Sequence, residues 1–305
     1  MQDQRAWFPE AHVRISFQHK VRTRRWIMLV SQGIDVCMQY HKAHSKPHTL
    51  RSYEFILSKF REQFGDRDIS SLSHEEVLEF MNHVCTGTRQ GTRSSRYAYL
   101  RSFFNFIRNN LDQNILNPCE APMFKRIFKP PELTQWNILD KEVVDELIFR
   151  TTNPRNRLML ELMARGGMRV SEVLKLKPQD IIDQKLILRD PKSGKEQEAV
   201  YIPQKIAERL KEYIQQKEIE SDKRIFPIKY VAAHAMVQKA GRMVGVTLRP
   251  HDLRRYAATY ASRSGVPIEI VSKVILRHAN LSTTQRYLGK ISDKEASRWI
   301  DNLYC

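Results

Sequence analysis

The sequence predicts a mainly helical protein of two domains, the second of which carries a small β-hairpin. Three observations predict this fold class. Apolar residues recur at helical spacing through the first part of the chain, a Pro-Pro pair interrupts that pattern, and two short strand-like segments flank a turn further on. With 305 residues the chain is long enough to bury two cores of ordinary size.

The segment 35–127 is predicted to form a small, wholly helical domain. From Thr49 to Phe64 the apolar residues are spaced by three and four positions, which is typical of an amphipathic helix. Ser73, followed by Glu76, predicts a capping box at the start of a second helix. A third helix is expected to begin near Thr92, with one apolar face made of Tyr97, Leu100, Phe104 and Ile107.

A proline pair marks the predicted domain boundary. Pro130 and Pro131 cannot continue a helix and favour an extended backbone, so we assign 128–138 to a linker. A second domain, which includes a terminal helix, is then expected at 139–305. Residues 1–34 contain a basic cluster without clear periodicity and are assigned to an N-terminal extension.

The second domain is predicted to open with helices and to continue with a hairpin. One helix is capped by Asp140, and a second begins near Arg157 and ends at Gly166-Gly167. The strand-like segments 185–189 and 198–202 are separated by the turn-forming residues 191–195. Most of the remaining chain is predicted to be helical.

The charge of the chain points to a polyanionic partner. The net charge is +17, and residues 1–135 hold 20 Lys and Arg against 13 Asp and Glu, so the excess is not confined to one end. Such a balance is expected of a protein that binds DNA, although it also fits a merely basic or ribosome-associated protein. Joined by a Pro-Pro link, two basic domains could close around a duplex as a C-shaped clamp.

Other sequence features favour a cytoplasmic protein that has no membrane partner. The four cysteines form no Cys-x-x-Cys pair, the apolar runs are shorter than a membrane span of about 20 residues, and the first residues do not resemble a signal peptide. His41, His44 and His48 are loosely spaced around Pro47, and no Cys or carboxylate completes a metal site there. We therefore expect neither a metal nor another cofactor.

Six residues form a set that suits attack on a phosphodiester. Its oxygens gain negative charge in the transition state, and guanidinium groups such as Arg169 and Arg254 are well suited to hold them. Histidine can move a proton near neutral pH, a hairpin lysine can protonate a leaving oxygen, and a tyrosine can act as the nucleophile when activated. The four candidates for these roles are His251, His278, Lys192 and Tyr287.

These residues lie in four segments that resemble the tyrosine recombinases, the family of phage integrases and Xer-type resolvases. The segments are "GGMRVSEVLKL", "PKSGKEQEAVYIP", "PHDLRRYAATYASRSGV" and "ILRHANLSTTQRY". Each motif alone is weak, but the reactive positions that they carry occur in the family's order. The resemblance covers the second half of the chain closely and the helical half in its layout.

The resemblance implies a role for each residue of the set. Arg169 and Arg254 would bind the scissile phosphate, and His251 would assist proton transfer. Lys192 would protonate the departing 5′ oxygen, His278 would hydrogen-bond the phosphate, and Tyr287 would form a 3′-phosphotyrosyl link. Glu172 would support the site, and Lys195 is an alternative to Lys192.

Two positions depart from the family's pattern. Arg277 stands before His278, where the family usually has glycine, and Arg255 follows Arg254, where histidine is frequent. Neither change removes a reactive group, and both add positive charge near the site.

We therefore predict a metal-independent, site-specific recombinase that acts as a homo-tetramer on paired inverted-repeat sites in double-stranded DNA. One alternative is a type IB topoisomerase-like nicking and closing enzyme, and another is a catalytically silent DNA-binding regulator of the same fold. The segment 86–110 has no acidic residue, so Arg89, Arg93 and Arg96 are candidates for DNA contacts in the first domain. An apolar stripe in the terminal helix, which includes Trp299 and Ile300, is expected to dock onto a neighbouring protomer or to pack within its own chain.

Overall fold

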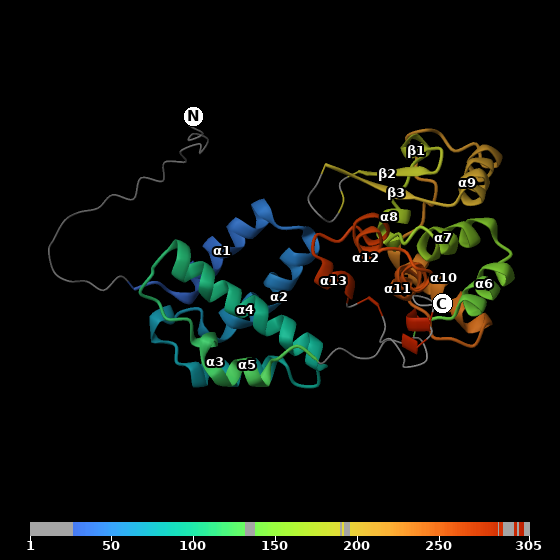
Figure 1. Cartoon of the computed structure of the whole chain (residues 1–305). Helices are drawn as coiled ribbons and strands as arrows, with labels where there is room; N and C mark the ends of the chain where they lie inside the picture. The colour runs from blue at the N-terminus through green and yellow to red at the C-terminus, as the bar shows by residue number, and fades with distance from the viewer. Residues whose placement is uncertain are drawn as a thin grey trace, which may run out of the picture. The chain divides into compact units, whose positions relative to one another are not determined.

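The computed structural model of the chain divides into two compact units, residues 1–132 and 133–305 (Figure 1). It describes residues 27–131, 138–189, 191, 196–285, 287–288, 296–297 and 299–301. The division falls inside the segment 128–138, the predicted linker. The mainly helical fold with a small sheet is confirmed by the order of the elements.

The described part of the first unit is built from helices and one isolated antiparallel bridge between Leu29 and Asp68. Its helices are α1 (Val30–His44), α2 (Pro47–Phe64), α3 (His74–Val84), α4 (Gln90–Asn110) and α5 (Pro122–Ile127), with the 3-10 turns η1 (Ile69–Ser71) and η2 (Pro118–Glu120). Ser73 and Glu76 form the predicted capping box at the start of α3. Helix α1 begins inside the segment that we assigned to an N-terminal extension, and its buried residues Val30, Ile34 and Cys37 have helical spacing.

Aromatic side chains fill the core of this unit. Phe60 on α2 is fully buried, and its ring packs edge-on or tilted against Phe64, Phe80, Phe103 and Phe104 with centroid separations of 5.0 to 6.2 Å. Edge-to-face packing of this kind is favourable for aromatic pairs. The core therefore joins α2, α3 and α4 into one body.

The second unit combines helices with one small sheet. Its helices are α6 (Lys141–Arg150), α7 (Pro154–Ala164), α8 (Val170–Val173), α9 (Gln204–Gln216), α10 (Tyr230–Met243), α11 (Pro250–Arg263), α12 (Ile268–Ile270) and α13 (Leu281–Gln285), with the 3-10 turn η3 (Pro178–Asp180) and the π-helical turn η4 (Val271–Leu276). The strands are β1 (Ile181–Ile182), β2 (Lys185–Arg189) and β3 (Gln197–Tyr201).

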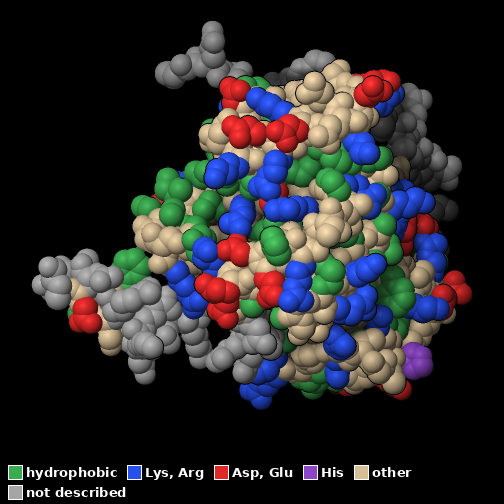
Figure 2. Space-filling model, turned by 90° about the vertical axis from the view of Figure 1, so that its right-hand side faces the viewer, with side chains coloured by type: hydrophobic (Ala, Val, Ile, Leu, Met, Phe, Trp, Pro, Cys, Tyr) green, Lys and Arg blue, Asp and Glu red, His purple; other side chains and the backbone are tan. Residues whose placement is uncertain are grey.

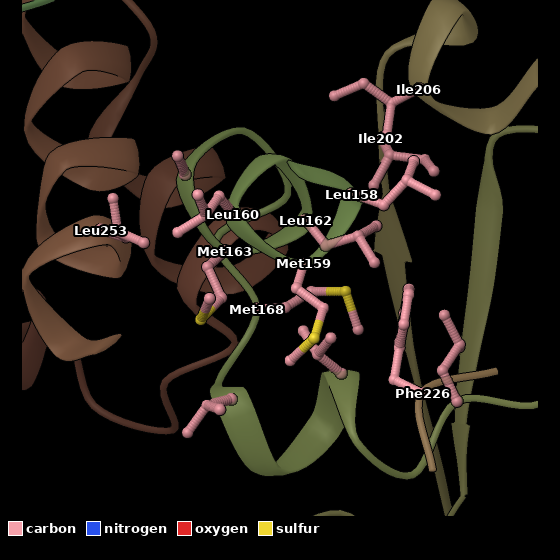
Figure 3. Packing of buried hydrophobic residues seen from close by; sticks show 14 of the residues in the cluster. Leu158, Met159, Leu160, Leu162, Met163, Met168, Ile202, Ile206, Phe226 and Leu253 are labelled. Atoms are coloured by element: carbon pink, nitrogen blue, oxygen red, sulfur yellow. The ribbon is translucent and has the colours of Figure 1, made fainter. Parts of the chain in front are cut away.

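Helix α7 lies at the centre of the core of the second unit. All of its residues from Leu158 to Ala164 are buried. Figure 3 shows α7 between Leu253 of α11 on one side and Ile202, Ile206 and Phe226 on the other. Because α7 packs on several elements at once, the turn that follows it is held in a defined place.

The predicted hairpin is present as two strands of an antiparallel sheet with the order β1-β2-β3. Leu188 pairs with Glu198, and Arg189 pairs with Gln197, at the end of the ladder that leads to the turn. Lys192 and Lys195, the two candidates for the general acid, stand between these strands in the sequence and lie outside the described residues.

Lys and Arg side chains are spread over the face of the molecule shown in Figure 2 rather than gathered in a single patch, and Asp and Glu lie among them.

In the described part of the chain, no helix combines the length and the hydropathy needed to cross a bilayer.

Candidate active site

A buried arginine, Arg254, connects the segments that carry the other predicted site residues. Its side chain lies on α11 and is fully buried. Nη1 donates to the carbonyl oxygen of Gly167, and Nη2 donates to that of Leu276. These carbonyls stand two residues before Arg169 and His278, so one guanidinium holds both segments.

Arg254 has more N–H donors than the two that bind these carbonyls. A guanidinium has five N–H bonds. The Nε of Arg254 is buried and has no acceptor within hydrogen-bond reach in the described part of the chain. Burial, followed by repulsion from Arg169 and Arg277, lowers the pKa of Arg254 from its ordinary value. A guanidinium nevertheless stays protonated at neutral pH, so positive charge is held in place here.

Arg169 is placed by a glycine turn and by a carboxylate. Gly167 adopts a φ of +59°, and a Cβ atom there would stand 2.8 Å from Cγ2 of Ile275, so the turn after α7 requires glycine. Arg169 is the N-cap residue of α8, and its Nη1 donates to Oε1 of Glu172 at 2.6 Å. Its backbone N–H donates to Oε2 of Glu172 at 2.7 Å. Helix α8 itself is a single turn that ends at Val173.

The carboxylate of Glu172 also binds a second arginine. Nη2 of Arg277 donates to Oε2 of Glu172 at 2.7 Å. Burial alone would raise the pKa of Glu172, but the guanidiniums of Arg277 and Arg169 lower it below its ordinary value. The carboxylate is therefore ionised, and it holds two arginines at once.

Arg277 itself has an unusual backbone conformation. Its φ of 53° and ψ of 47° place it in the left-handed region, which costs a residue other than glycine roughly 1 to 2 kcal/mol. This conformation ends the π-helical turn η4 and gives the chain the direction in which His278 follows. Its side chain is 4% exposed, so the charge that the sequence placed near the site lies inside the protein.

His278 is held by two hydroxyl groups. Its Nδ1 lies 3.0 Å from Oγ1 of Thr284, which in turn donates to Oγ of Ser272 at 2.8 Å. The backbone N–H of His278 donates to the carbonyl oxygen of Ser272 at 2.9 Å. Partial burial of the ring, followed by repulsion from Arg254, Arg169 and Arg277, lowers the pKa of His278 to about 4.

Tyr287 lies beside His278 in the same chain. The two ring centroids are 4.9 Å apart, with an angle of 60° between the ring planes. The carbonyl oxygen of Tyr287 accepts a hydrogen bond from Oγ1 of Thr259 at 3.2 Å, and the guanidinium carbon of Arg255 is 5.9 Å from the ring centroid. Elements α11 and α13 therefore bring the tyrosine next to the arginines and the histidine.

His251 occupies a different environment from Arg254. Both lie in the first turns of α11, and their spacing predicts that they share a face, yet His251 is exposed whereas Arg254 is fully buried. Partial desolvation of the His251 ring, followed by repulsion from Arg254, Arg255 and Arg169, lowers its pKa. The ring is therefore neutral at physiological pH and reachable from solvent.

The sequence profile of the phage integrase family matches residues 137–292 of the chain. A tyrosine recombinase of Thermosipho africanus is 30% identical over 277 residues, which cover 83% of this chain and 93% of that protein. The chain belongs to the phage integrase family. Tyrosine recombinase XerA of Thermococcus kodakarensis is 29% identical and covers 79% of this chain and 84% of its own length.

Solved structures of integrases share the fold of this family member. The Tn1549 transposon integrase in complex with transposon right end DNA has a TM-score of 0.72 and 14% identity, covering 91% of this chain and 100% of that one. A lambda integrase dimer bound to a core site has a TM-score of 0.67 and 17% identity, covering 85% and 95%.

The candidate DNA-binding arginines of this integrase differ in their surroundings. Arg89 is the exposed N-cap residue of α4. The guanidinium of Arg93 stacks on Phe128 at 5.6 Å, and that of Arg96 stacks on Phe55 at 4.5 Å while Nη1 donates to the carbonyl oxygen of Val84 at 2.5 Å. Arg96 is thus the most strongly tied to its own domain, and Arg89 is the most accessible.

Several supporting residues of the integrase site were missed by sequence reasoning. Ser272, Thr284 and Thr259 hold the His278 and Tyr287 segments, and Glu198 on β3 lies 3.6 Å from Nε of Arg277. Their partners lie elsewhere in the chain or in a turn, where periodicity carries no signal. The "STTQRY" motif contains Thr284 but does not reveal its contact.

The environment of His278 predicts its titration. Because the folded protein disfavours the charged ring, the midpoint should lie near 4 rather than near the ordinary value of 6.5. NMR titration of the histidine ring signals measures it, and the signal that disappears in H278Q identifies the residue. A midpoint of 6 or above would show that burial and the arginines do not disfavour the charged ring.

Proposed function

We propose that this chain cleaves and rejoins DNA as a site-specific recombinase, with Tyr287 as the nucleophile. The observation that carries this proposal is the double hydrogen bond of Arg254 to the carbonyls of Gly167 and Leu276, because it gathers the Arg169 and His278 segments around one point. Tyr287 lies next to His278. Fixed guanidiniums and a neighbouring hydroxyl are what attack on a phosphodiester requires.

The proposed reaction is a transesterification. The hydroxyl oxygen of Tyr287 forms a bond to the scissile phosphorus and loses its proton to a base, for which the exposed, neutral His251 is suited. The bond from phosphorus to the 5′ oxygen breaks, and Lys192, or Lys195 as the alternative, donates the proton to that oxygen. The products are a 3′-phosphotyrosyl ester and a free 5′ hydroxyl.

Arg169 and Arg254 stabilise the negative charge that develops on the non-bridging oxygens, and His278 hydrogen-bonds the phosphate. The ester conserves the energy of the cleaved bond. Attack on it by the 5′ hydroxyl of a second DNA strand therefore completes strand exchange without another energy source.

We further propose the assembly in which this reaction occurs. Four protomers would bind two paired inverted-repeat sites, and the two units would enclose the duplex as a C-shaped clamp. In this proposal, residues 35–127 bind DNA with Arg89, Arg93 and Arg96 as phosphate contacts, 139–305 is the catalytic domain, and the protein acts in the cytoplasm.

The first test concerns the nucleophile. Y287F removes only the hydroxyl, so we expect DNA binding to remain and covalent adduct formation to disappear. The assay uses labelled duplexes from the DNA that flanks the chain's own reading frame, trapped by denaturation and visualised on a gel. A protease-sensitive adduct formed by Y287F would identify another nucleophile, and no adduct with the wild-type protein would favour a silent DNA-binding regulator.

The second test concerns the fixed positive charge. R169A and R254A should each lower the cleavage rate by about 10²–10³-fold, because each removes a donor that acts on the transition state. Their affinity for DNA should change far less. R224A, which removes an exposed arginine of the same unit, serves as the matched control. Since arginines supply the charge, wild-type cleavage should continue in EDTA; loss in EDTA that Mg²⁺ restores would contradict the mechanism.

The third test concerns the terminal helix. Trp299 lies 3.5 Å from the position of a Cβ atom on Gly265 of its own chain, whereas Ile300 is 57% exposed. We propose that the exposed part of the stripe docks onto a neighbouring protomer. Deletion of residues 292–305, or the milder I300D, should preserve binding to single sites but abolish two-site complexes and recombination, as followed by gel shift. Wild-type synapsis in both variants would mean that the stripe packs only within its own chain.

A further inference from the structure

We propose that Arg277 is a positioning residue for DNA cleavage, which holds Arg169, the hairpin strand β3 and the His278 turn in one arrangement. This inference rests on the proposed function. It concerns a side chain that the mechanism above does not use.

The contacts of Arg277 reach three separate segments. Nη2 donates to Glu172, whose other carboxylate oxygen holds Arg169. Nε lies 3.6 Å from Oε2 of Glu198, which is too long for a hydrogen bond but within reach of an ion pair. Nη1 donates to the carbonyl oxygen of Ile275 at 2.8 Å, within the turn that precedes His278.

Glu198 gives Arg277 a connection to the general acid. It lies on β3 opposite Leu188, at the end of the hairpin that leads to the turn with Lys192 and Lys195. Its side chain is 7% exposed, as buried as that of a core residue. An ion pair at this point restrains the turn end of the hairpin ladder relative to α8, and a planar guanidinium can hold two carboxylates in a way that an ammonium cannot.

The charge balance gives Arg277 a second task. Arg169, Arg254 and Arg277 carry three positive charges near the two carboxylates of Glu172 and Glu198. Without Arg277, the two negative carboxylates would neutralise the two remaining arginines. Arg169 would then be the arginine that stays bound to Glu172. With Arg277 present, the cluster retains positive charge for a phosphate.

A direct contact between Arg277 and DNA does not fit this geometry. All three of its side-chain nitrogens face protein oxygens, on Ile275, Glu172 and Glu198. This occupation, rather than burial, separates Arg277 from the fully buried Arg254, whose Nε faces no acceptor in the described part of the chain. The contacts also keep it in the left-handed conformation that non-glycine residues avoid. Arg277 therefore acts through other residues.

The experiment compares R277K and R277G with the wild-type protein in single-turnover cleavage. The substrate is a duplex from the DNA flanking the reading frame, nicked so that the fragment with the leaving 5′ hydroxyl diffuses away. We expect R277K to cleave at least about 10-fold more slowly and R277G about 100-fold more slowly, since small displacements of reacting groups have effects of this size. The Kd for the same duplex should stay within about twofold.

E218G is the matched control for the backbone change. Glu218 is also left-handed, with a φ of 51°, and it is exposed at the end of α9. Its replacement should leave the cleavage rate unchanged. If R277K cleaves faster than R277G while the Kd of the two variants is the same, Arg277 acts by positioning and not through a general loss of folding.

The link to Glu198 is tested by a double-mutant cycle. E198Q should slow cleavage, and the double variant R277K/E198Q should be no slower than R277K, because both changes break the same contact. E198Q and R277K leave the left-handed residue in place and carry the test even where R277G does not fold. If the losses of cleavage rate in R277K and E198Q add in the double variant, or if R277K and R277G cleave at the wild-type rate, the inference is overturned. If the wild-type protein forms no adduct at all, the result instead contradicts the proposed function.

Discussion

The site depends on the burial of one charge, the guanidinium of Arg254. A buried charge is strongly destabilising unless polar groups replace its water. Here the carbonyl oxygens of Gly167 and Leu276 take that place. Both carbonyls belong to turns, so the stable burial of Arg254 requires that the glycine turn after α7 and the end of η4 are formed together. Folding of the second unit is thus coupled to assembly of the candidate site.

Burial and repulsion between like charges act together in the cluster around Arg254. Burial, followed by the nearness of the other guanidiniums, disfavours the charged forms of Arg254 and His278 and lowers the pKa of each. Glu172 counters this repulsion from a buried position where its own ionised form is favoured by Arg277 and Arg169. The result is positive charge that is in place before DNA arrives, which is the arrangement that stabilises a developing phosphorane without further rearrangement.

Part of the fold and of the site could be predicted from local patterns. Helical spacing predicted α2 and α4. The pair Ser73 and Glu76 predicted the capping box of α3. Turn-forming residues between β-prone segments indicated the hairpin. Helix α1 was missed, although Val30, Ile34 and Cys37 carry its spacing. The burial of Arg254 beside the exposed His251 was not predictable, because their spacing of three defines a shared face but not the depth to which each side chain is covered.

The sequence by itself determined the mainly helical fold and the hairpin, since these follow from spacing and residue type along the chain. The predicted site residues from Arg169 to Tyr287 came from residue type together with the resemblance to a known family. Only the tertiary structure decided which carboxylates and hydroxyls support that set. Glu172 meets Arg277 across 105 positions, and Thr259 meets Tyr287 across 28. Contacts of this kind depend on how α7, α11 and η4 pack, and packing is set by the shapes of many side chains at once rather than by any local pattern.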